Sequence, residues 1–294
     1  MRPQIGLRLG IDAPVRAGYQ PCAMKDIVEN RQRLTLGEKV EILQVALRQN
    51  GFQWAALFGL YYAASRVADG AFGAMHRLRL RRGIPGLNSP ELNRLIWKGW
   101  DWNAGGEEWT ISPEWKDSLI RCVLERELPA GGQVLEIGPG AGRWTGHLIA
   151  RAESYAGVDI SETCVRLCSE KFAGKPGVAF HLTRGAELSM IPDRSVDALW
   201  SYDVFVHINE PEAASYARDF ARVLKPGARG VIQHGAIAGE KGGWRSTLTT
   251  ESFARILGEA GLRVLRQFDH WEDGGKRHEC GLYGDVITVF ERPA

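Results

Sequence analysis

The sequence has few cysteines and nothing that resembles a disulfide framework. Its 294 residues include five cysteines, an odd number, and these are scattered along the chain at Cys22, Cys122, Cys164, Cys168 and Cys280. We read no secretory signal before them and therefore expect free thiols in a cytoplasmic, reducing setting. Cys164 and Cys168 stand one helical turn apart, but no third cysteine and no histidine lies near them, so the pattern favours packing over a metal site. We expect no metal.

The sequence also lacks a strong net charge and a long uninterrupted apolar run. It has 37 Lys and Arg against 35 Asp and Glu, a formal net charge of +2, and no broad basic run of the kind that nucleic-acid binding uses. The most apolar stretch, residues 52–75, is interrupted by Arg66 and Asp69 before it reaches the ~20 apolar residues of a membrane span. We expect a soluble protein with no nucleic-acid partner.

The first part of the chain predicts helices rather than a sheet. Residues 1–23 carry three prolines and no periodicity, so we expect a disordered arm and take Met24 as a candidate for the native start. From Thr35, with Glu38 three residues later as in a capping box, apolar residues recur at helical spacing. Residues 24–110 are therefore interpreted as a helical, tryptophan-rich region.

The helix predicted at residues 52–75 is followed directly by a cluster of basic residues. These are His76, Arg77, Arg79, Arg81 and Arg82. An apolar helix joined to basic residues is what a contact with a membrane surface uses, so residues 52–82 are a candidate for peripheral contact with the inner membrane face. The alternative, which we favour, is that the helix packs on the main domain or on a second subunit and that the arginines are solvated. A homo-oligomer is thus a second hypothesis.

From residue 111 to 294, strands and helices alternate. Strands are predicted at 133–137, 154–159, 178–182, 196–202, 229–234, 263–269 and 284–291, and helices at about 142–152, 161–173, 211–224 and 250–260. Alternation of this kind predicts an α/β fold, a doubly wound and mostly parallel seven-stranded sheet. The last two strands have no helix between them, so we expect the last one to be antiparallel.

A glycine-rich turn follows the first predicted strand. Residues 134–144 read as a buried strand, a turn with Gly138, Gly140 and Gly142, and the start of a helix. Such a turn presents backbone N–H groups to a nucleotide-like ligand. Arg143 stands where a dinucleotide site has its third glycine, and no Gly-Lys-Ser/Thr follows, so the turn fits neither a nicotinamide dinucleotide nor a P-loop.

Two acidic residues limit the chemical class of ligand that this turn can bind. Glu136 precedes the first glycine, where a carboxylate repels a pyrophosphate but can orient an ammonium group. Asp159 ends the second predicted strand, where an acid can accept hydrogen bonds from both hydroxyls of a ribose. The ligand predicted by these positions has a ribose and a positive group but no diphosphate.

Residues 114–292 resemble the class I S-adenosylmethionine-dependent methyltransferases. The motifs that carry the resemblance are Glu136 to Gly142, Asp159, residues 191–197 (Ile-Pro-Asp-Arg-Ser-Val-Asp), residues 200–208 (Trp-Ser-Tyr-Asp-Val-Phe-Val-His-Ile) and the turn Leu224 to Gly230. The resemblance implies that S-adenosylmethionine is bound by Glu136, Gly138, Pro139, Gly140, Gly142, Trp144, Asp159, Ile160, Gly185, Ala186, Tyr202 and Trp109. One departure is Thr183-Arg184-Gly185, where many members have an Asp or Asn that meets the adenine.

Five of the ten tryptophans crowd together just before the first strand, at Trp97, Trp100, Trp102, Trp109 and Trp115. In the resembled fold this segment lies over the ligand, so Trp109 is a candidate to cover the adenosine or the sulfonium. The alternative is an aromatic core that joins the two parts of the chain. Together with the glycine turn, the segment is similar to a bacterial group of methyltransferases that modify sugars and surface polysaccharides.

Methyl transfer to a hydroxyl oxygen gains from a general base near the departing proton. The candidates are His207 and Asp203 after the fourth strand and His234 at the end of the fifth, and we favour His207. The leading hypothesis is therefore methylation of a hydroxyl of a sugar, a glycan or another small molecule. The alternatives are a scaffold protein at the membrane face that retains the fold and a nicotinamide-dependent oxidoreductase. The sequence has no Asn-Pro-Pro-aromatic motif of the kind found in amino-methylating enzymes.

Overall fold

The computed structural model describes residues 35–236, 245–281 and 283–294. The arm expected at 1–23 and the candidate start at Met24 lie outside the described residues. The chain divides into two compact units, residues 1–75 and residues 76–294. Each unit is described by itself.

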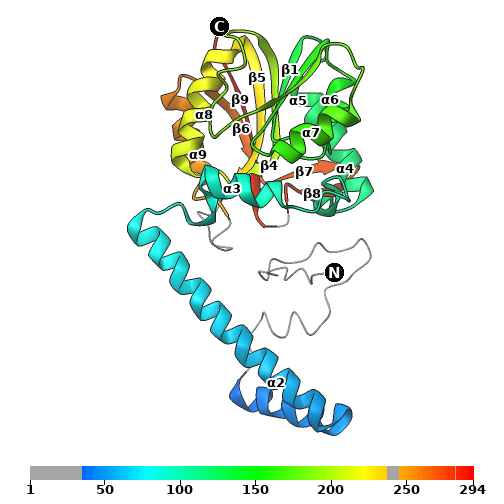
Figure 1. The fold of residues 1–294 in the computed structure, drawn as a ribbon, viewed down its shortest axis with the longest axis vertical. Coiled ribbons are helices and arrows are strands. Elements are labelled where there is room, and N and C mark those ends of the chain that lie inside the picture. The colour runs from blue at the N-terminus through cyan, green and yellow to red at the C-terminus, as the bar shows by residue number, and fades with distance from the viewer. Residues whose placement is uncertain (1–34, 237–244, 282) are drawn as a thin grey trace, which may run out of the picture. The chain divides into compact units, whose positions relative to one another are not determined.

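The first unit consists, in its described part, of most of helix α2 (Leu36–Arg82). Gly51 has a φ of 80°, which breaks the helix into two arms that double back on each other (Figure 1). At the start of the first arm, Glu38 N–H donates to Thr35 Oγ1 and Thr35 N–H donates to Glu38 Oε2, the two reciprocal bonds of a capping box. No helix of the described residues is long and apolar enough to cross a membrane.

The second unit is built on a seven-stranded sheet with the order β3-β2-β1-β4-β5-β9-β6. The strands are β1 (Gln133–Ile137), β2 (Ser154–Asp159), β3 (Val178–Leu182), β4 (Val196–Phe205), β5 (Leu224–Gly235), β6 (Arg263–Phe268) and β9 (Asp285–Glu291). Strands β1 to β5 are parallel, and β9 is antiparallel to both β5 and β6. The predicted fold, a mostly parallel sheet with an antiparallel last strand, is confirmed.

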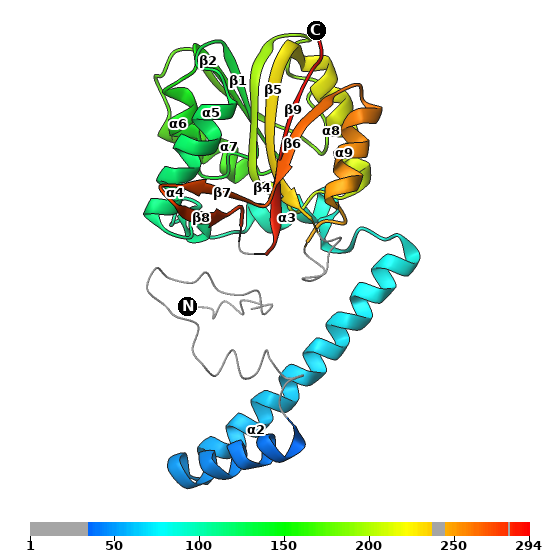
Figure 2. The ribbon, with the colours of Figure 1, turned by 180° about the vertical axis from the view of Figure 1, so that it is seen from behind.

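Helices cover both faces of this sheet (Figures 1 and 2). Besides the end of α2, the helices described in this unit are η1 (Gly86–Asn88), α3 (Pro90–Lys98), η2 (Glu107–Trp109), α4 (Pro113–Leu119), the π-helical η3 (Ile120–Leu124), α5 (Glu125–Glu127), α6 (Thr145–Ile149), α7 (Glu162–Lys171), α8 (Glu210–Val223) and α9 (Thr250–Glu259). The α-helix after the glycine turn is shorter than expected and begins only at Thr145, because the turn itself occupies residues 138–144.

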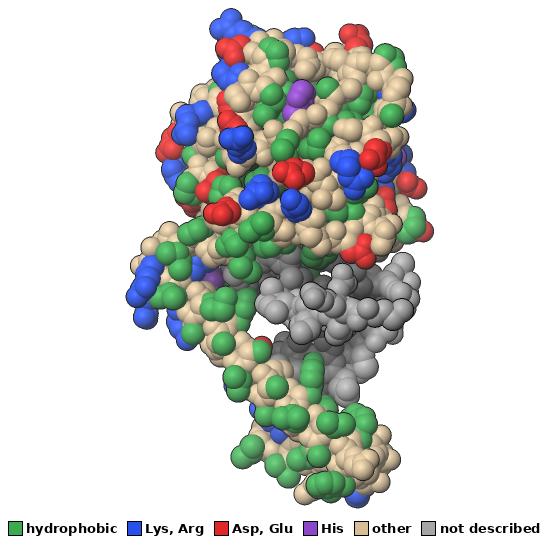
Figure 3. Space-filling view, viewed as in Figure 1, with side chains coloured by type: hydrophobic (Ala, Val, Ile, Leu, Met, Phe, Trp, Pro, Cys, Tyr) green, Lys and Arg blue, Asp and Glu red, His purple; other side chains and the backbone are tan. Residues whose placement is uncertain are grey.

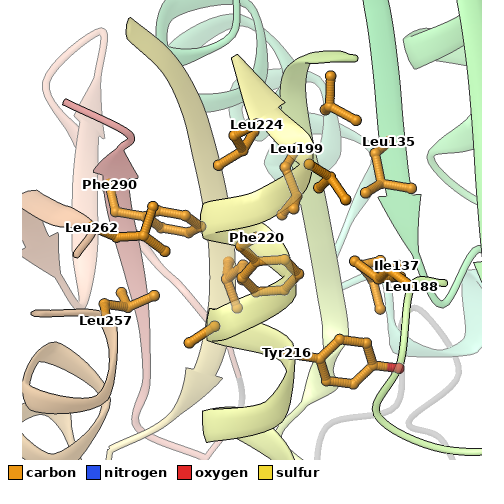
Figure 4. Packing of buried hydrophobic residues seen from close by; sticks show 14 of the residues in the cluster. Leu135, Ile137, Leu188, Leu199, Tyr216, Phe220, Leu224, Leu257, Leu262 and Phe290 are labelled. Atoms are coloured by element: carbon orange, nitrogen blue, oxygen red, sulfur yellow. The ribbon is translucent and has the colours of Figure 1, made fainter. Parts of the chain in front are cut away.

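The two faces of the sheet bury different kinds of side chain. On one face, Phe220 of α8 packs with Leu199 of β4 and Phe290 of β9 in an aliphatic and phenyl core (Figure 4). The other face buries an aromatic cluster that includes Trp115, Trp144, Trp200, Tyr202 and Trp271. Burying both faces is what a mostly parallel sheet requires.

The connection between β6 and β9 contains a hairpin that the sequence did not predict. It pairs β7 (His270–Asp273) with β8 (Lys276–Glu279). Trp271 of this hairpin joins the aromatic cluster, and its Nε1 donates to Ser118 Oγ at 2.8 Å. The hairpin therefore extends the aromatic core beyond the edge of the main sheet.

Helix α3 lies at the edge of the sheet where the parallel strands have their carboxyl ends (Figures 1 and 2). Ser89 caps it by accepting from Leu92 N–H, and Pro90 takes the first position. Lys98 pairs with Glu162 of α7, and Asn93 Nδ2 donates to the carbonyl of His207 after β4. These contacts hold α3 across the edge at which open α/β sheets bind ligands.

Candidate cofactor and acceptor site

The glycine turn leaves β1 in a conformation that requires glycine. Gly138, Gly140 and Gly142 have φ values of 70°, 58° and 83°, in the left-handed region that other residues rarely adopt. A Cβ on Gly138 would also lie 2.3 Å from Cγ2 of Val204 on β4. The backbone of the turn therefore packs directly against the end of β4, at the point where the strand order reverses between β1 and β4.

Asp159 ends β2 beside this turn. Its Oδ2 accepts from Gly140 N–H at 3.1 Å and its Oδ1 accepts from Ser161 N–H at 2.8 Å. The side chain is buried, and burial raises the pKa of Asp159 to about 6. The carboxylate predicted to meet a ribose is thus fixed by two backbone donors, and its remaining lone pairs can accept hydroxyl groups.

Glu136 lies beneath the turn and is buried. Its Oε2 accepts from Thr145 Oγ1 at 2.7 Å and from Tyr155 OH at 2.5 Å. Burial, opposed by these two hydrogen bonds, raises the pKa of Glu136 to about 7. In the structure this carboxyl group joins β1, β2 and the start of α6, which fixes the turn from below.

Four tryptophans, Trp97, Trp100, Trp102 and Trp109, pack together as the tryptophan cluster. Their ring centroids lie 5.4 to 6.1 Å apart. A Cβ on Gly140 would lie 3.1 Å from Cζ3 of Trp102, so this ring rests on the glycine turn. The segment that carries the cluster therefore covers the turn and is more than a linker.

Asp203 at the end of β4 is held in an ion pair. It has a φ of 60°, its N–H donates to Gln233 Oε1 at 2.8 Å, and its Oδ2 accepts from Arg143 Nη1 at 2.5 Å. Arg143 is itself buried and lies over the Trp144 ring, with the guanidinium carbon 4.5 Å from the ring centroid. Oδ2 of Asp203 is thus engaged in the ion pair with Arg143.

His234 is a core residue, and its prediction as a catalytic candidate is wrong. It is fully buried, with Nδ1 2.8 Å from the carbonyl oxygen of Gly235 and Nε2 2.7 Å from Thr288 Oγ1. Burial lowers the pKa of His234 to about 4. With both ring nitrogens engaged, it has no free atom with which to take a proton from a ligand.

His207 lies in the turn after β4 and is only partly buried. Its N–H donates to the carbonyl of Val204, and its ring lies 5.3 Å from that of Trp97. Of the three predicted candidates, it is the one that combines partial exposure with a place beside the tryptophan cluster and the end of β4.

The other predicted cofactor residues lie after β3, beside the glycine turn and Asp159, and in the aromatic core. Gly185 and Ala186 follow β3, where Thr183 Oγ1 and Gly185 hydrogen-bond each other in a tight turn and Arg184 is exposed. Pro139 and Ile160 belong to the glycine turn and to the residue after Asp159. Trp144 and Tyr202 instead pack their rings 5.3 Å apart in the aromatic core, so we assign both a packing role.

Several polar residues at this edge have no direct signal in the sequence. In the sequence, Arg143 stands out only as a residue that does not fit a dinucleotide turn. Its partner Asp203 lies 60 residues further along the chain. Gln233 bridges Asp203 to Asp285, which pairs with Arg245. Pairings of this kind depend on strand order, which a single sequence does not specify residue by residue.

Comparison with known proteins identifies a methyltransferase domain in this part of the chain. Residues 134–227 match a family described as "Methyltransferase domain". The chain is 34% identical over 83 residues to "Ribosomal RNA small subunit methyltransferase A" of Synechococcus sp. (strain JA-2-3B'a(2-13)), covering 27% of this chain and 29% of that protein. It is 33% identical over 103 residues to "Demethylmenaquinone methyltransferase" of Tropheryma whipplei (strain Twist), covering 35% and 41%. The chain thus spans less than half the length of these two curated relatives.

A solved structure extends the similarity in fold. The geranyl diphosphate C-methyltransferase of Streptomyces coelicolor A3(2), solved with Mg2+, geranyl diphosphate and S-adenosyl-L-homocysteine, has a TM-score of 0.52 and 12% identity. The match covers 69% of this chain and 97% of that one. At this identity the likeness is one of fold alone. The family match at residues 134–227 lies within the second unit.

The raised pKa of Glu136 predicts a specific dependence of stability on pH. The folded protein keeps this proton up to about pH 7, whereas the unfolded chain loses it near 4.5, the ordinary pKa of a glutamate. As the pH rises through this window, the free energy of unfolding should therefore fall, by about 3 kcal/mol for this group. In Glu136→Gln, which keeps an acceptor for Thr145 and Tyr155, this part of the fall should disappear. Urea unfolding of both proteins at pH 5 and pH 8 measures this fall in the free energy of unfolding. An equal fall in the unaltered protein and in Glu136→Gln would contradict the assignment.

Proposed function

We propose that this protein is an S-adenosylmethionine-dependent methyltransferase that methylates a hydroxyl oxygen of a sugar, a glycan or another small molecule. The observation that carries the proposal is the glycine turn with Asp159 bound to Gly140 N–H, within the segment that matches a methyltransferase domain. This arrangement combines backbone donors for a zwitterionic ligand with a fixed acid for a ribose. Nicotinamide chemistry is disfavoured because Arg143, in an ion pair with Asp203, occupies the third-glycine position.

The residues at this edge fit S-adenosylmethionine. The backbone of Gly138 to Gly142 would lie along the ligand, Asp159 would accept the ribose hydroxyls, and Gly185, Ala186 and Ile160 would border the adenine. Trp109, in the tryptophan cluster above the turn, offers a ring face that attracts a cation. When bound, S-adenosylmethionine supplies an electrophilic methyl group on a sulfonium, and the protein's task is then mainly to position the acceptor.

The tryptophan cluster also determines access to the turn. Trp102 rests on Gly140, so a ligand that lies along this glycine requires the Trp102 ring to move aside. Gly105 and Gly106, with φ values of 69° and 87°, follow Trp102 in the same segment. Backbone freedom at these two glycines would allow the segment to open and close while α3 stays in place.

His207 would act as the general base toward the acceptor hydroxyl. The surroundings of the other two candidates support this choice, since Asp203 forms an ion pair with Arg143 and His234 is buried with both ring nitrogens bonded. A neutral imidazole can accept the proton as the oxygen is methylated. All four cysteines of the described residues are free, and burial raises the pKa of the Cys168 thiol to about 12. Free thiols fit a reducing compartment such as the cytoplasm.

Isothermal titration with S-adenosylhomocysteine tests the cofactor half of the proposal. We expect binding by the unaltered protein and a loss of about 1–3 kcal/mol of binding free energy in Asp159→Ala, because charge-assisted hydrogen bonds to the ribose disappear. Glu170→Gln, which removes an exposed acid near the end of helix α7, is the matched control and should bind normally. Absence of binding by the unaltered protein would end the proposal.

Substitution of His207 tests the chemical half. His207→Asn should lower turnover by about 10²–10⁴-fold, because the general base is lost, and should leave S-adenosylhomocysteine binding unchanged. His270→Asn, a histidine on β7 that pairs with Asp269, serves as the control. Turnover is followed as label transferred from S-adenosylmethionine in a fractionated extract of the host. Unchanged turnover in His207→Asn would remove this residue from the mechanism.

A further inference from the structure

In the segment from the last turn of α2 to the first half of α3, three polar side chains are buried and have atoms that form no hydrogen bond with another described residue. Arg79 is 3% exposed, Asn88 0% and Asn93 7%. Within the part of the chain that the structure describes, Arg79 Nε, both amide atoms of Asn88 and Asn93 Oδ1 have no hydrogen-bond partner. Folded proteins leave few such atoms, and a group of them in one segment points to a ligand that completes it.

This segment adjoins the turn that carries His207. Arg79 Nη2 donates to Asn209 Oδ1 at 2.7 Å, and Asn209 Nδ2 donates to the carbonyl of Pro85 at 3.2 Å. Asn93 Nδ2 donates to the carbonyl of His207 at 3.1 Å. Two of the three side chains, those of Arg79 and Asn93, therefore hydrogen-bond through their other atoms to the loop after β4.

Arg79 is a buried cation without a counter-ion. Its hydrogen bonds go to the carbonyl of Arg245 and the amide oxygen of Asn209, and among the described residues it forms no ion pair with a carboxylate. Burial accordingly lowers the pKa of Arg79. The prediction that the arginines after residue 75 are solvated is wrong for this one. A buried guanidinium is stabilised when an anion reaches it, so the charge balance favours a negatively charged ligand.

We propose that Arg79, Asn88 and Asn93 bind an acidic, hydroxylated methyl acceptor. A carboxylate or phosphate accepts hydrogen bonds from Arg79 Nε and from the amide N–H of Asn88, and a hydroxyl of the same molecule donates to Asn93 Oδ1. Because Asn93 also holds the carbonyl of His207, the acceptor is placed beside the proposed base. This inference rests on the proposed function and narrows its substrate class.

The stability of the ligand-free protein gives a first test, which does not require the acceptor. Asn88→Leu replaces a buried amide with no partner by an apolar side chain of similar size, so the melting temperature should rise by about 2–6 °C. Asn93→Leu loses the hydrogen bond to His207 and should melt at a lower temperature. A fall in the melting temperature of Asn88→Leu would show that its amide stabilises the fold and would overturn the proposal.

Label transfer gives the second test. A host metabolite extract is split by anion exchange, and each fraction is incubated with the full chain and labelled S-adenosylmethionine. We expect label in the retained, acidic fraction, a decrease of at least tenfold with Asn88→Leu or Arg79→Gln, and no decrease with the exposed neighbour Arg81→Gln. Both binding-site variants should still bind S-adenosylhomocysteine.

The outcomes of this experiment separate the two proposals. Label confined to the unretained, neutral fraction overturns the acidic acceptor and leaves methyl transfer in place. Label in no fraction overturns the proposed function, and the acceptor site falls with it. Label in the acidic fraction that both variants transfer as well as the unaltered protein overturns the roles of Arg79 and Asn88.

A second inference rests on a different surface, the apolar stripe of α2. On the first arm, Leu36, Val40, Leu43 and Leu47 are all exposed and follow one another at intervals of four, three and four residues. This is the spacing with which helices interlock in coiled coils and bundles. Apolar side chains are also exposed along the second arm, where Figure 3 shows them in green, at Leu57, Leu60, Val67, Phe72 and Met75.

The charges of this surface fit a copy of itself better than a membrane. Residues 36–75 carry three basic and three acidic side chains, namely Lys39, Arg48, Arg66, Glu38, Glu41 and Asp69. A helix that binds a membrane surface instead separates a cationic face from an apolar one. The start of the first arm carries Glu38 and Glu41 against Lys39 alone, and Arg48 lies near its end, so antiparallel pairing with a second copy brings opposite net charges together.

We infer that the apolar stripe of α2 binds the same stripe of a second copy of this chain, forming a helical bundle. Multi-angle light scattering of the full chain should give the mass of a dimer. Leu43→Glu should give a monomer, whereas Gln44→Glu, which adds the same charge next to the stripe, should remain a dimer. A monomeric unaltered protein overturns the inference, and so does a monomer that floats with anionic phospholipid vesicles, because a membrane is then the occupant.

Discussion

The close approach of Gly138 to Val204 is the constraint on which the candidate site depends. A Cβ on Gly138 would lie 2.3 Å from the Val204 side chain, so the end of β1 can pack against the end of β4 only where a glycine stands. This contact brings the glycine turn beside the residues that follow β4. As a result, Asp159 on one side and His207 on the other face the same edge of the sheet, although 48 residues separate them.

A polar network supports this edge from the other side. Arg143 of the turn pairs with Asp203 near the end of β4. Gln233 of β5 joins Asp203 to Asp285 of β9, and Arg245 pairs with Asp285. Its two cations and two carboxylates balance, as buried charges require. Asp203, at a φ of 60°, is fixed by both neighbours. The network thereby fixes the end of β4, from which the turn with His207 begins.

The sequence predicted the fold well because strand and helix periodicities are local. The strands, the parallel direction of most of them and the antiparallel β9 follow from alternation and from the missing helix after β6. The glycine turn and Asp159 were also predictable, since positive φ angles and an acid at a strand tip leave a clear trace. The hairpin of β7 and β8 was not predicted, because its pairing depends on Trp271 docking into the aromatic core.

The residues that depend on tertiary contacts could not be assigned from the sequence. His234 was predicted as a catalytic candidate from its place at the end of β5, but its burial between Thr288 and Phe253 is visible only in the fold. Arg79 was grouped with exposed arginines, whereas the turn through Pro85 buries it against Asn209. Asn88 gave no signal, because a single asparagine in a Gly/Pro-rich loop has the composition of an ordinary turn.

The most direct measurement of the central claim is a crystal structure of the protein with S-adenosylhomocysteine. The account predicts the ribose on Asp159, the ligand along Gly138 to Gly142, and the Trp102 ring moved off Gly140. A ligand bound at another edge of the sheet, or a glycine turn still covered by Trp102 in crystals grown with saturating ligand, would contradict it.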